Sequence, residues 1–124
     1  MWKYYNPNPK KQIVGDCVIR AVSLALGESW QDVYSDIAIK GFILADMPSS
    51  DAVWTSYIRG KGFKVKPLPD TCPACYTLRD FCADHPTGTY IVKCSEHVVT
   101  VVDGDYYDTW DSGDQVAYFF YTKE

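Results

Sequence analysis

The sequence predicts an α+β protein whose helices come first and whose antiparallel strands come last. Before residue 87, apolar side chains recur at the spacing of helical turns, between polar starts and glycine or proline ends. From residue 88 onwards, β-branched and aromatic residues dominate, as they do in strands. Asp103-Gly104 stands between two of these runs and is a strong hairpin signal. With 124 residues, the chain is expected to form one domain covering residues 1–124.

The first elements are predicted to be an extended arm and a helix. Residues 4–11 should be extended, because each proline disfavours helical geometry in the residue before it. A helix is predicted to start at Asp16 or Cys17, with the Asp16 carboxylate capping free backbone N–H groups. Gly27 supplies its end. The buried stripe of this helix consists of Val18, Ala21, Val22 and Ala25.

Three more helices are expected downstream, at residues 29–41, 49–60 and 77–86. In the first of them, Ser29 and Asp32 resemble a capping box, and Gly41 is expected to end the helix.

Strands are expected in five places. One short strand precedes the last helix at residues 63–69 and is broken at Pro67. The other four form the C-terminal sheet, at residues 88–94, 97–103, 106–110 and 116–122.

Composition excludes several classes of function. The net charge of −4 gives no electrostatic basis for binding nucleic acid or an anionic membrane. No apolar run approaches the roughly 18 residues of a membrane span, and the N-terminus lacks a hydrophobic signal core. A cytoplasmic location is therefore expected. The five cysteines cannot all pair internally, which in a reducing compartment favours free, metal-bound or catalytic thiols.

Cys17 stands where a helix would favour a reactive thiol. The helix dipole and the unpaired N–H groups at its start stabilise a thiolate, and the same N–H groups can hold an oxyanion. Gln12, five residues upstream, offers an amide that can reach the same position. The alternative interpretation is a small core side chain for Cys17 and a surface loop side chain for Gln12.

His97 opens the strand that precedes the hairpin, and two registers give it different acidic partners. A three-residue turn at 103–105 places His97 opposite Asp111. A two-residue Asp103-Gly104 turn places residue 99 opposite Asp108, on the same face as the histidine. Either carboxylate would fix the tautomer of the imidazole and stabilise its charged form. The alternative is a half-buried strand histidine without a catalytic role.

These segments resemble the papain-like cysteine peptidase superfamily. QIVGDCVIRAVSLAL is similar to the segment that joins the glutamine to the nucleophile in the Josephin and bacteriocin-processing branches. HVVTVVDGDYYDTWDS is similar to the histidine hairpin of Josephin domains. The chain also resembles compact hypothetical proteins of bacteria and phages. The resemblance implies a papain-like fold in which the Cys17 helix packs on an antiparallel sheet. It assigns Cys17 as nucleophile, His97 as base, Asp111 as orienter and Gln12 as oxyanion donor. Asp108 is the alternative acid that the two-residue turn would favour.

The function expected from this resemblance is hydrolysis of a peptide or isopeptide bond in a protein or peptide substrate, without a cofactor. An acyltransferase or deamidase that uses the same triad is the first alternative. A catalytically silent binding protein of the same fold is the second. Nothing in the sequence indicates an oligomeric state.

A zinc site is a separate possibility, and it conflicts with none of these functions. Cys72-x-x-Cys75 is followed by Cys82-x-x-His85, and two short-spaced pairs are a common way to hold zinc. The separation of the pairs is shorter than in the usual fingers, and Cys82 lies on the apolar side of its predicted helix. The expectation is therefore that no metal is bound.

Overall fold

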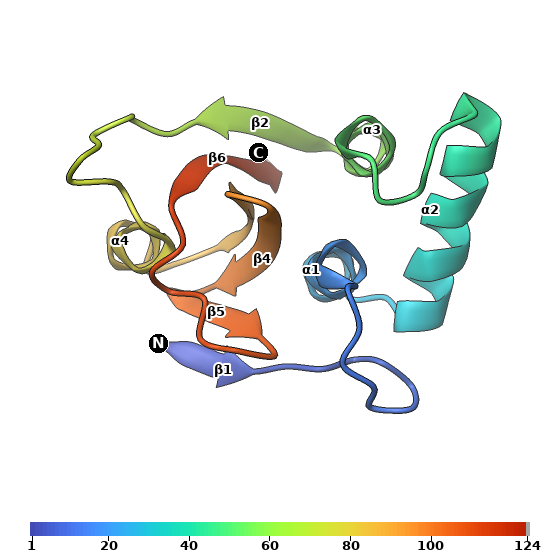
Figure 1. Ribbon diagram of the computed structural model, residues 1–124, viewed down its shortest axis with the longest axis horizontal. Coiled ribbons are helices and arrows are strands. Elements are labelled where there is room, and N and C mark those ends of the chain that lie inside the picture. The colour runs from blue at the N-terminus through green and yellow to red at the C-terminus, as the bar shows by residue number, and fades with distance from the viewer. Residues whose placement is uncertain (124) are drawn as a thin grey trace.

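A computed structural model describes residues 1–123 and shows four helices and a six-stranded mixed sheet (Figure 1). The α+β class predicted from the sequence is confirmed. The helices are α1 (Cys17–Leu26), α2 (Trp30–Leu44), α3 (Asp51–Gly60) and α4 (Leu78–Asp84). The strands are β1 (Trp2–Tyr4), β2 (Phe63–Pro67), β3 (Thr89–Cys94), β4 (His97–Val102), β5 (Asp105–Asp108) and β6 (Ala117–Lys123).

The sheet has the strand order β1-β5-β4-β3-β6-β2. All neighbouring strands are antiparallel except β1, which runs parallel to β5 with Trp2 opposite Tyr106. The prediction of a purely antiparallel sheet is therefore wrong at this edge. A strand of three residues is too short to leave an alternating pattern in the sequence, and its partner lies about a hundred residues away.

The turn between β4 and β5 sets the register of the hairpin that carries the candidate histidine. Val102 pairs with Asp105, so the turn consists of Asp103 and Gly104 alone. Both turn residues have positive φ, 50° and 80°, as a two-residue type I′ turn requires. Of the two registers that the sequence allowed, the structure has the two-residue one.

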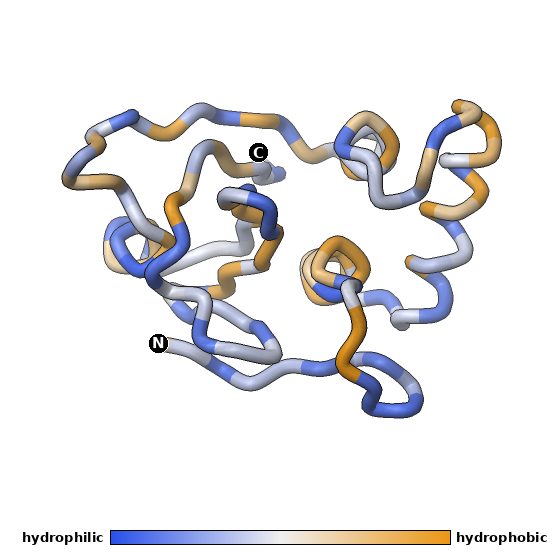
Figure 2. The backbone as a smooth tube through the Cα atoms, in the orientation of Figure 1, coloured by the Kyte–Doolittle hydropathy of each residue, from blue (hydrophilic) through white to orange (hydrophobic). Residues whose placement is uncertain are grey.

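The sheet separates two apolar clusters. α1 packs on β4 and β3, with α2 outside it and α3 beside it at the β2 edge of the sheet, whereas α4 covers the opposite face (Figure 1). Neighbouring strand residues alternate between the clusters: Ile91 and Tyr121 face the α1 side, while Val92 and Phe120 face α4. Figure 2 shows hydrophobic residues along α1 and the central strands, and hydrophilic residues along much of the loop that leads into α1.

Two glycines that the sequence marked as helix ends behave differently. Gly27 ends α1 in the left-handed conformation, with φ at 67°, as predicted. Gly41 lies inside α2, which continues to Leu44, so the prediction that it ends the helix is wrong. A Cβ at Gly41 would lie 2.8 Å from the backbone oxygen of Asp46, in the segment that leads into α3. The glycine is required by that close approach.

None of the helices within residues 1–123 combines the length and hydrophobicity needed to cross a lipid bilayer.

Replacing Gly41 by alanine should destabilise the protein by about 1 to 3 kcal/mol. The new methyl group meets backbone atoms that cannot rotate away, and this cost exceeds the helix propensity that alanine adds. Urea unfolding of Gly41→Ala measures the loss.

Gly60→Ala is the matched control, because Gly60 ends α3 with nothing within 4 Å of a Cβ. This variant should be neutral or more stable by ~0.5 kcal/mol. Equal stability of the two variants would contradict the packing argument.

Candidate functional site

Cys17 opens α1, and the helix end around it has no side-chain cap. The first helical hydrogen bond runs from Arg20 N to Asp16 O at 2.9 Å. The N–H groups of Cys17, Val18 and Ile19 precede it and have no acceptor within the helix. Asp16 holds the N-cap position, but its side chain makes no capping hydrogen bond. The prediction that its carboxylate caps the helix is therefore wrong.

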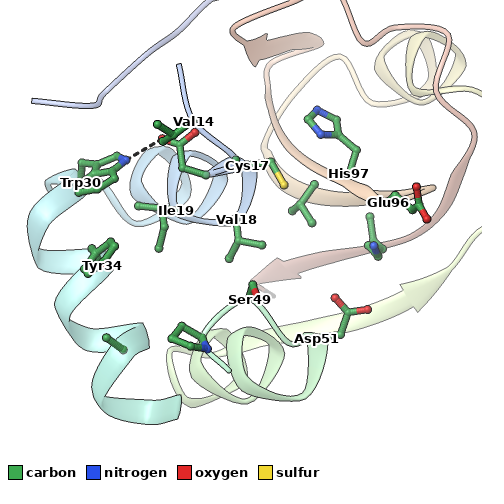
Figure 3. A pocket seen from close by; sticks show the side chains of 16 residues that line it. Val14, Cys17, Val18, Ile19, Trp30, Tyr34, Ser49, Asp51, Glu96 and His97 are labelled. Carbon is green, nitrogen blue, oxygen red and sulfur yellow. Dashed lines mark hydrogen bonds between the residues drawn. The ribbon is translucent and has the colours of Figure 1, made fainter. Parts of the chain in front are cut away.

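The Asp16 carboxylate has two other partners. The indole Nε1 of Trp30 donates to its Oδ2 at 2.8 Å (Figure 3, dashed line). Its Oδ1 accepts from the guanidinium of Arg20, one turn further along α1. Because both oxygens are held by these side chains, the carboxylate makes no hydrogen bond to the backbone N–H groups at the start of α1.

His97 opens β4 and is 7% exposed. Its Nε2 lies 2.6 Å from Oδ2 of Asp108, the last residue of β5. The two-residue turn explains this contact, because it puts Asp108 opposite Val99, two residues from His97 on the same face of the hairpin.

Asp108 is held as a carboxylate by four hydrogen bonds. Oδ2 accepts from His97 and from the Ser112 hydroxyl, each at 2.6 Å. Oδ1 accepts from Arg20 at 2.9 Å and from the backbone N–H of Thr109 at 2.8 Å. Burial raises the pKa of Asp108, but its hydrogen bonds with His97 and Ser112 and the nearby positive charges outweigh burial and lower it.

Asp111 lies elsewhere, so the prediction that it orients His97 is wrong. Its carboxylate accepts from the Tyr106 hydroxyl and, at 3.5 Å, from the exposed Arg79. The physical reason is the length of the turn: one residue more at 103–105 would have brought Asp111 opposite the histidine. Instead it fastens the loop after β5, which carries Ser112 to Asp108.

The environment of Cys17 favours its thiolate. Burial alone raises the pKa of the thiol, but a side-chain hydrogen bond with His97, a backbone hydrogen bond with Val98 and the charges of His97 and Arg20 together lower it. These are the causes that activate a cysteine in a nucleophilic site.

The pKa of the His97 imidazole is raised, whereas that of the Cys17 thiol is lowered. Burial lowers its pKa, but hydrogen bonds and charge from Asp108 and Cys17 raise it to about 9. Because Nε2 bonds to Asp108, Nδ1 is the nitrogen that is left for the thiol. The lowered pKa of the thiol and the raised pKa of the imidazole both act in favour of a thiolate paired with an imidazolium.

Gln12 does not contribute to the site in this structure. It is exposed and does not line the cleft at Cys17. Its backbone is held by two buried asparagines, Asn6 and Asn8, in a loop that projects away from the body of the molecule (Figure 1). The prediction that its amide reaches the oxyanion position is therefore wrong, and the open N–H groups of α1 remain as donors.

Cys17 and His97 line a cleft of about 470 Å³ between α1, α2 and the β3–β4 turn. Figure 3 shows the sulfur pointing from the start of α1 towards the strand that bears the histidine. One wall is a stacked pair of rings, Trp30 and Tyr34, with centroids 5.1 Å apart. Most of the remaining lining is apolar, which suits the side chains of a peptide better than a phosphate or a sugar.

Trp110 packs against the histidine, with ring centroids 5.0 Å apart. It is 44% exposed, so it is not a core side chain. Its position makes it a partial cover over His97.

The four residues considered for zinc do not come together. Cys72 and Cys75 form a disulfide, although the sequence analysis favoured free thiols. Cys82 is buried in the cluster beneath α4, and the ring of His85 stacks on Phe81 at 3.8 Å. Within residues 1–123, no group of three or more His, Cys, Asp or Glu side chains is arranged to hold a metal ion.

Two side chains that hold Asp108 beside His97 were not predicted from the sequence. Arg20 was visible only as an acid–base pair with Asp16 at helical spacing, since its second partner, Asp108, is 88 residues away. Ser112 lies in a loop without a periodic pattern, and nothing in the sequence marked it.

Comparisons of this chain with family models, with curated proteins and with solved structures find no match.

Proposed function

We propose that this protein is a thiol hydrolase that cleaves peptide or isopeptide bonds through Cys17, His97 and Asp108. The observation that carries the proposal is the imidazole of His97 hydrogen-bonded to a buried carboxylate, with the Cys17 thiol beside it in the same apolar cleft and its pKa lowered by the histidine. A nucleophile, a base and an orienting acid in this order are what acyl transfer through a thioester requires.

In the acylation step, Nδ1 of His97 holds the proton of the thiol, and the thiolate of Cys17 attacks the carbonyl carbon to form a C–S bond. The carbonyl oxygen becomes an oxyanion, which accepts hydrogen bonds from the open N–H groups at the start of α1. The C–N bond then breaks as His97 gives its proton to the departing amine.

In the deacylation step, His97 takes a proton from a water molecule, and the resulting hydroxide attacks the thioester. The C–S bond breaks, the thiolate leaves and is again paired with the imidazolium, and the product is a carboxylic acid. Asp108 stays ionised throughout and stabilises the charged imidazole.

The cleft supports an acyl group with apolar side chains. Val18, Ile19 and Ala38 line it together with the rings of Trp30 and Tyr34. Because the leaving amine must face His97, the acyl part of the substrate lies along the wall made by α1 and α2. Peptides with leucine or phenylalanine near the scissile bond are therefore the first substrates to test.

Cys17 should be alkylated by iodoacetamide at pH 7 several-fold faster than free cysteine, because its lowered pKa increases the share of thiolate. His97→Ala should remove most of this advantage. Peptides with a fluorogenic amide then test turnover, which Cys17→Ser should abolish. Alkylation at the rate of free cysteine, or an unchanged rate in His97→Ala, would refute the proposal.

Asp108→Asn and Asp111→Asn form a matched pair for the same assays. Asp108→Asn should lower turnover by at least ~10²-fold, because the imidazole loses the carboxylate that fixes its tautomer. Asp111→Asn should stay within about threefold of the wild-type protein, since its contacts are to Tyr106 and Arg79. The reverse order of effects would reinstate the three-residue register.

The proton on His97 should be lost only near pH 9. The pKa of His97 is raised because Asp108 and Cys17 stabilise the imidazolium. Cys17→Ser and Asp108→Asn should therefore each lower the pKa of His97 towards 6.5. NMR titration of the two histidines, assigned with His97→Ala, measures the pKa of His97 directly.

The rate of turnover plotted against pH should be bell-shaped, with its alkaline limb near pH 9. Both limbs belong to the coupled pair of Cys17 and His97. A wild-type pKa at or below 6.5 is incompatible with the pairing.

A further inference from the structure

Arg20 is a buried cation between the nucleophile helix and the acid of the proposed triad. It is 5% exposed and lies one turn after Cys17 in α1. One guanidinium nitrogen bonds to Asp16, and the other bonds to Asp108 at 2.9 Å. Both partner carboxylates are also buried.

The guanidinium is the direct protein bridge between α1 and the end of β5 at this site. Its planar group presents two nitrogens at a fixed spacing, and each is used on a different carboxylate. A lysine has the charge but only one nitrogen, so it cannot reproduce both bonds at the same geometry. Without the bridge, Oδ1 of Asp108 would keep only the Thr109 backbone N–H.

We propose that Arg20 is a positioning residue: it holds Asp108 in line with His97 and keeps Cys17 at a fixed distance from that pair. This inference rests on the proposed function of Cys17. Arg20 acts through the two carboxylates and through its charge, and it does not touch the reacting atoms.

Two independent observations agree with this role. The positive charge of Arg20 is among the causes that lower the pKa of Cys17 and of Asp108, although burial of each group acts in the opposite direction. In addition, Asp16 links Arg20 to Trp30, a wall of the cleft. The same network therefore joins the substrate wall to the triad.

The test compares Arg20→Met, Arg20→Lys and Arg59→Met by iodoacetamide alkylation of Cys17 as a function of pH, with circular dichroism to check folding. Arg20→Met should raise the apparent pKa of Cys17 by about one unit and slow alkylation at pH 7 roughly tenfold. Arg20→Lys should show a loss of about threefold. Arg59→Met, at the far end of α3, should match the wild-type protein.

A purely structural role would lower the unfolding temperature and leave this pH profile unchanged. A folded Arg20→Met with the wild-type profile overturns the inference. If Arg20→Met does not fold, Arg20→Lys decides the matter, and a wild-type profile in that variant overturns it equally. If the wild-type protein itself shows no lowered thiol pKa, it is the proposed function that fails.

Discussion

The buried cluster of Asp16, Arg20 and Asp108 is the interaction on which the geometry of the site depends. Three charges in a protein interior are costly unless each is hydrogen-bonded, and here one guanidinium reaches both carboxylates while Trp30 and Ser112 bond to further oxygens. The cluster fastens the first turn of α1 to the end of β5. Any rearrangement of the helix against the sheet would leave a buried charge unpaired. The bonds that position His97 therefore also resist movement of the nucleophile helix.

The same cluster explains why the start of α1 is left uncapped. An N-cap carboxylate ordinarily contributes about 1 kcal/mol by accepting from the first N–H groups of its helix. Asp16 forgoes those bonds because Arg20 and Trp30 hold its oxygens. A capped helix would place a carboxylate oxygen beside the thiol, where a reacting carbonyl would have to put its own negative charge. The hydrogen bonds of Asp16 with Arg20 and Trp30 therefore explain both the missing side-chain cap and the N–H groups left without an acceptor in the helix.

Features set by neighbouring residues, such as helix ends, could be predicted from the sequence. Contacts between residues far apart in the chain could not. The end of α1 at Gly27 follows from a backbone preference that acts within a few residues, whereas the start at Cys17 was expected from a side-chain cap that Asp16 does not make. Whether Asp108 or Asp111 lies beside His97 depends on whether the turn has two or three residues. Asp103-Gly104 favours the two-residue turn but does not determine it. Arg20 could not be assigned, because its partner on β5 is adjacent only after the sheet has formed. The sequence thus singled out Cys17 and His97, which the structure brings to one cleft, but it did not show which side chains hold them in place.

Burial raises the pKa of each of the three free cysteines in the described chain, and the neighbouring groups decide whether the pKa ends above or below its usual value. Burial raises the pKa of Cys82 to about 11 and that of Cys94 to about 12, because neither thiol has a hydrogen-bonded cation to offset it. Cys17 is partly buried at the cleft, yet His97 and Arg20 act on it, and its pKa is lowered. The groups that share the interior with each sulfur decide its charge, and only at Cys17 are those groups cationic and close enough to bond.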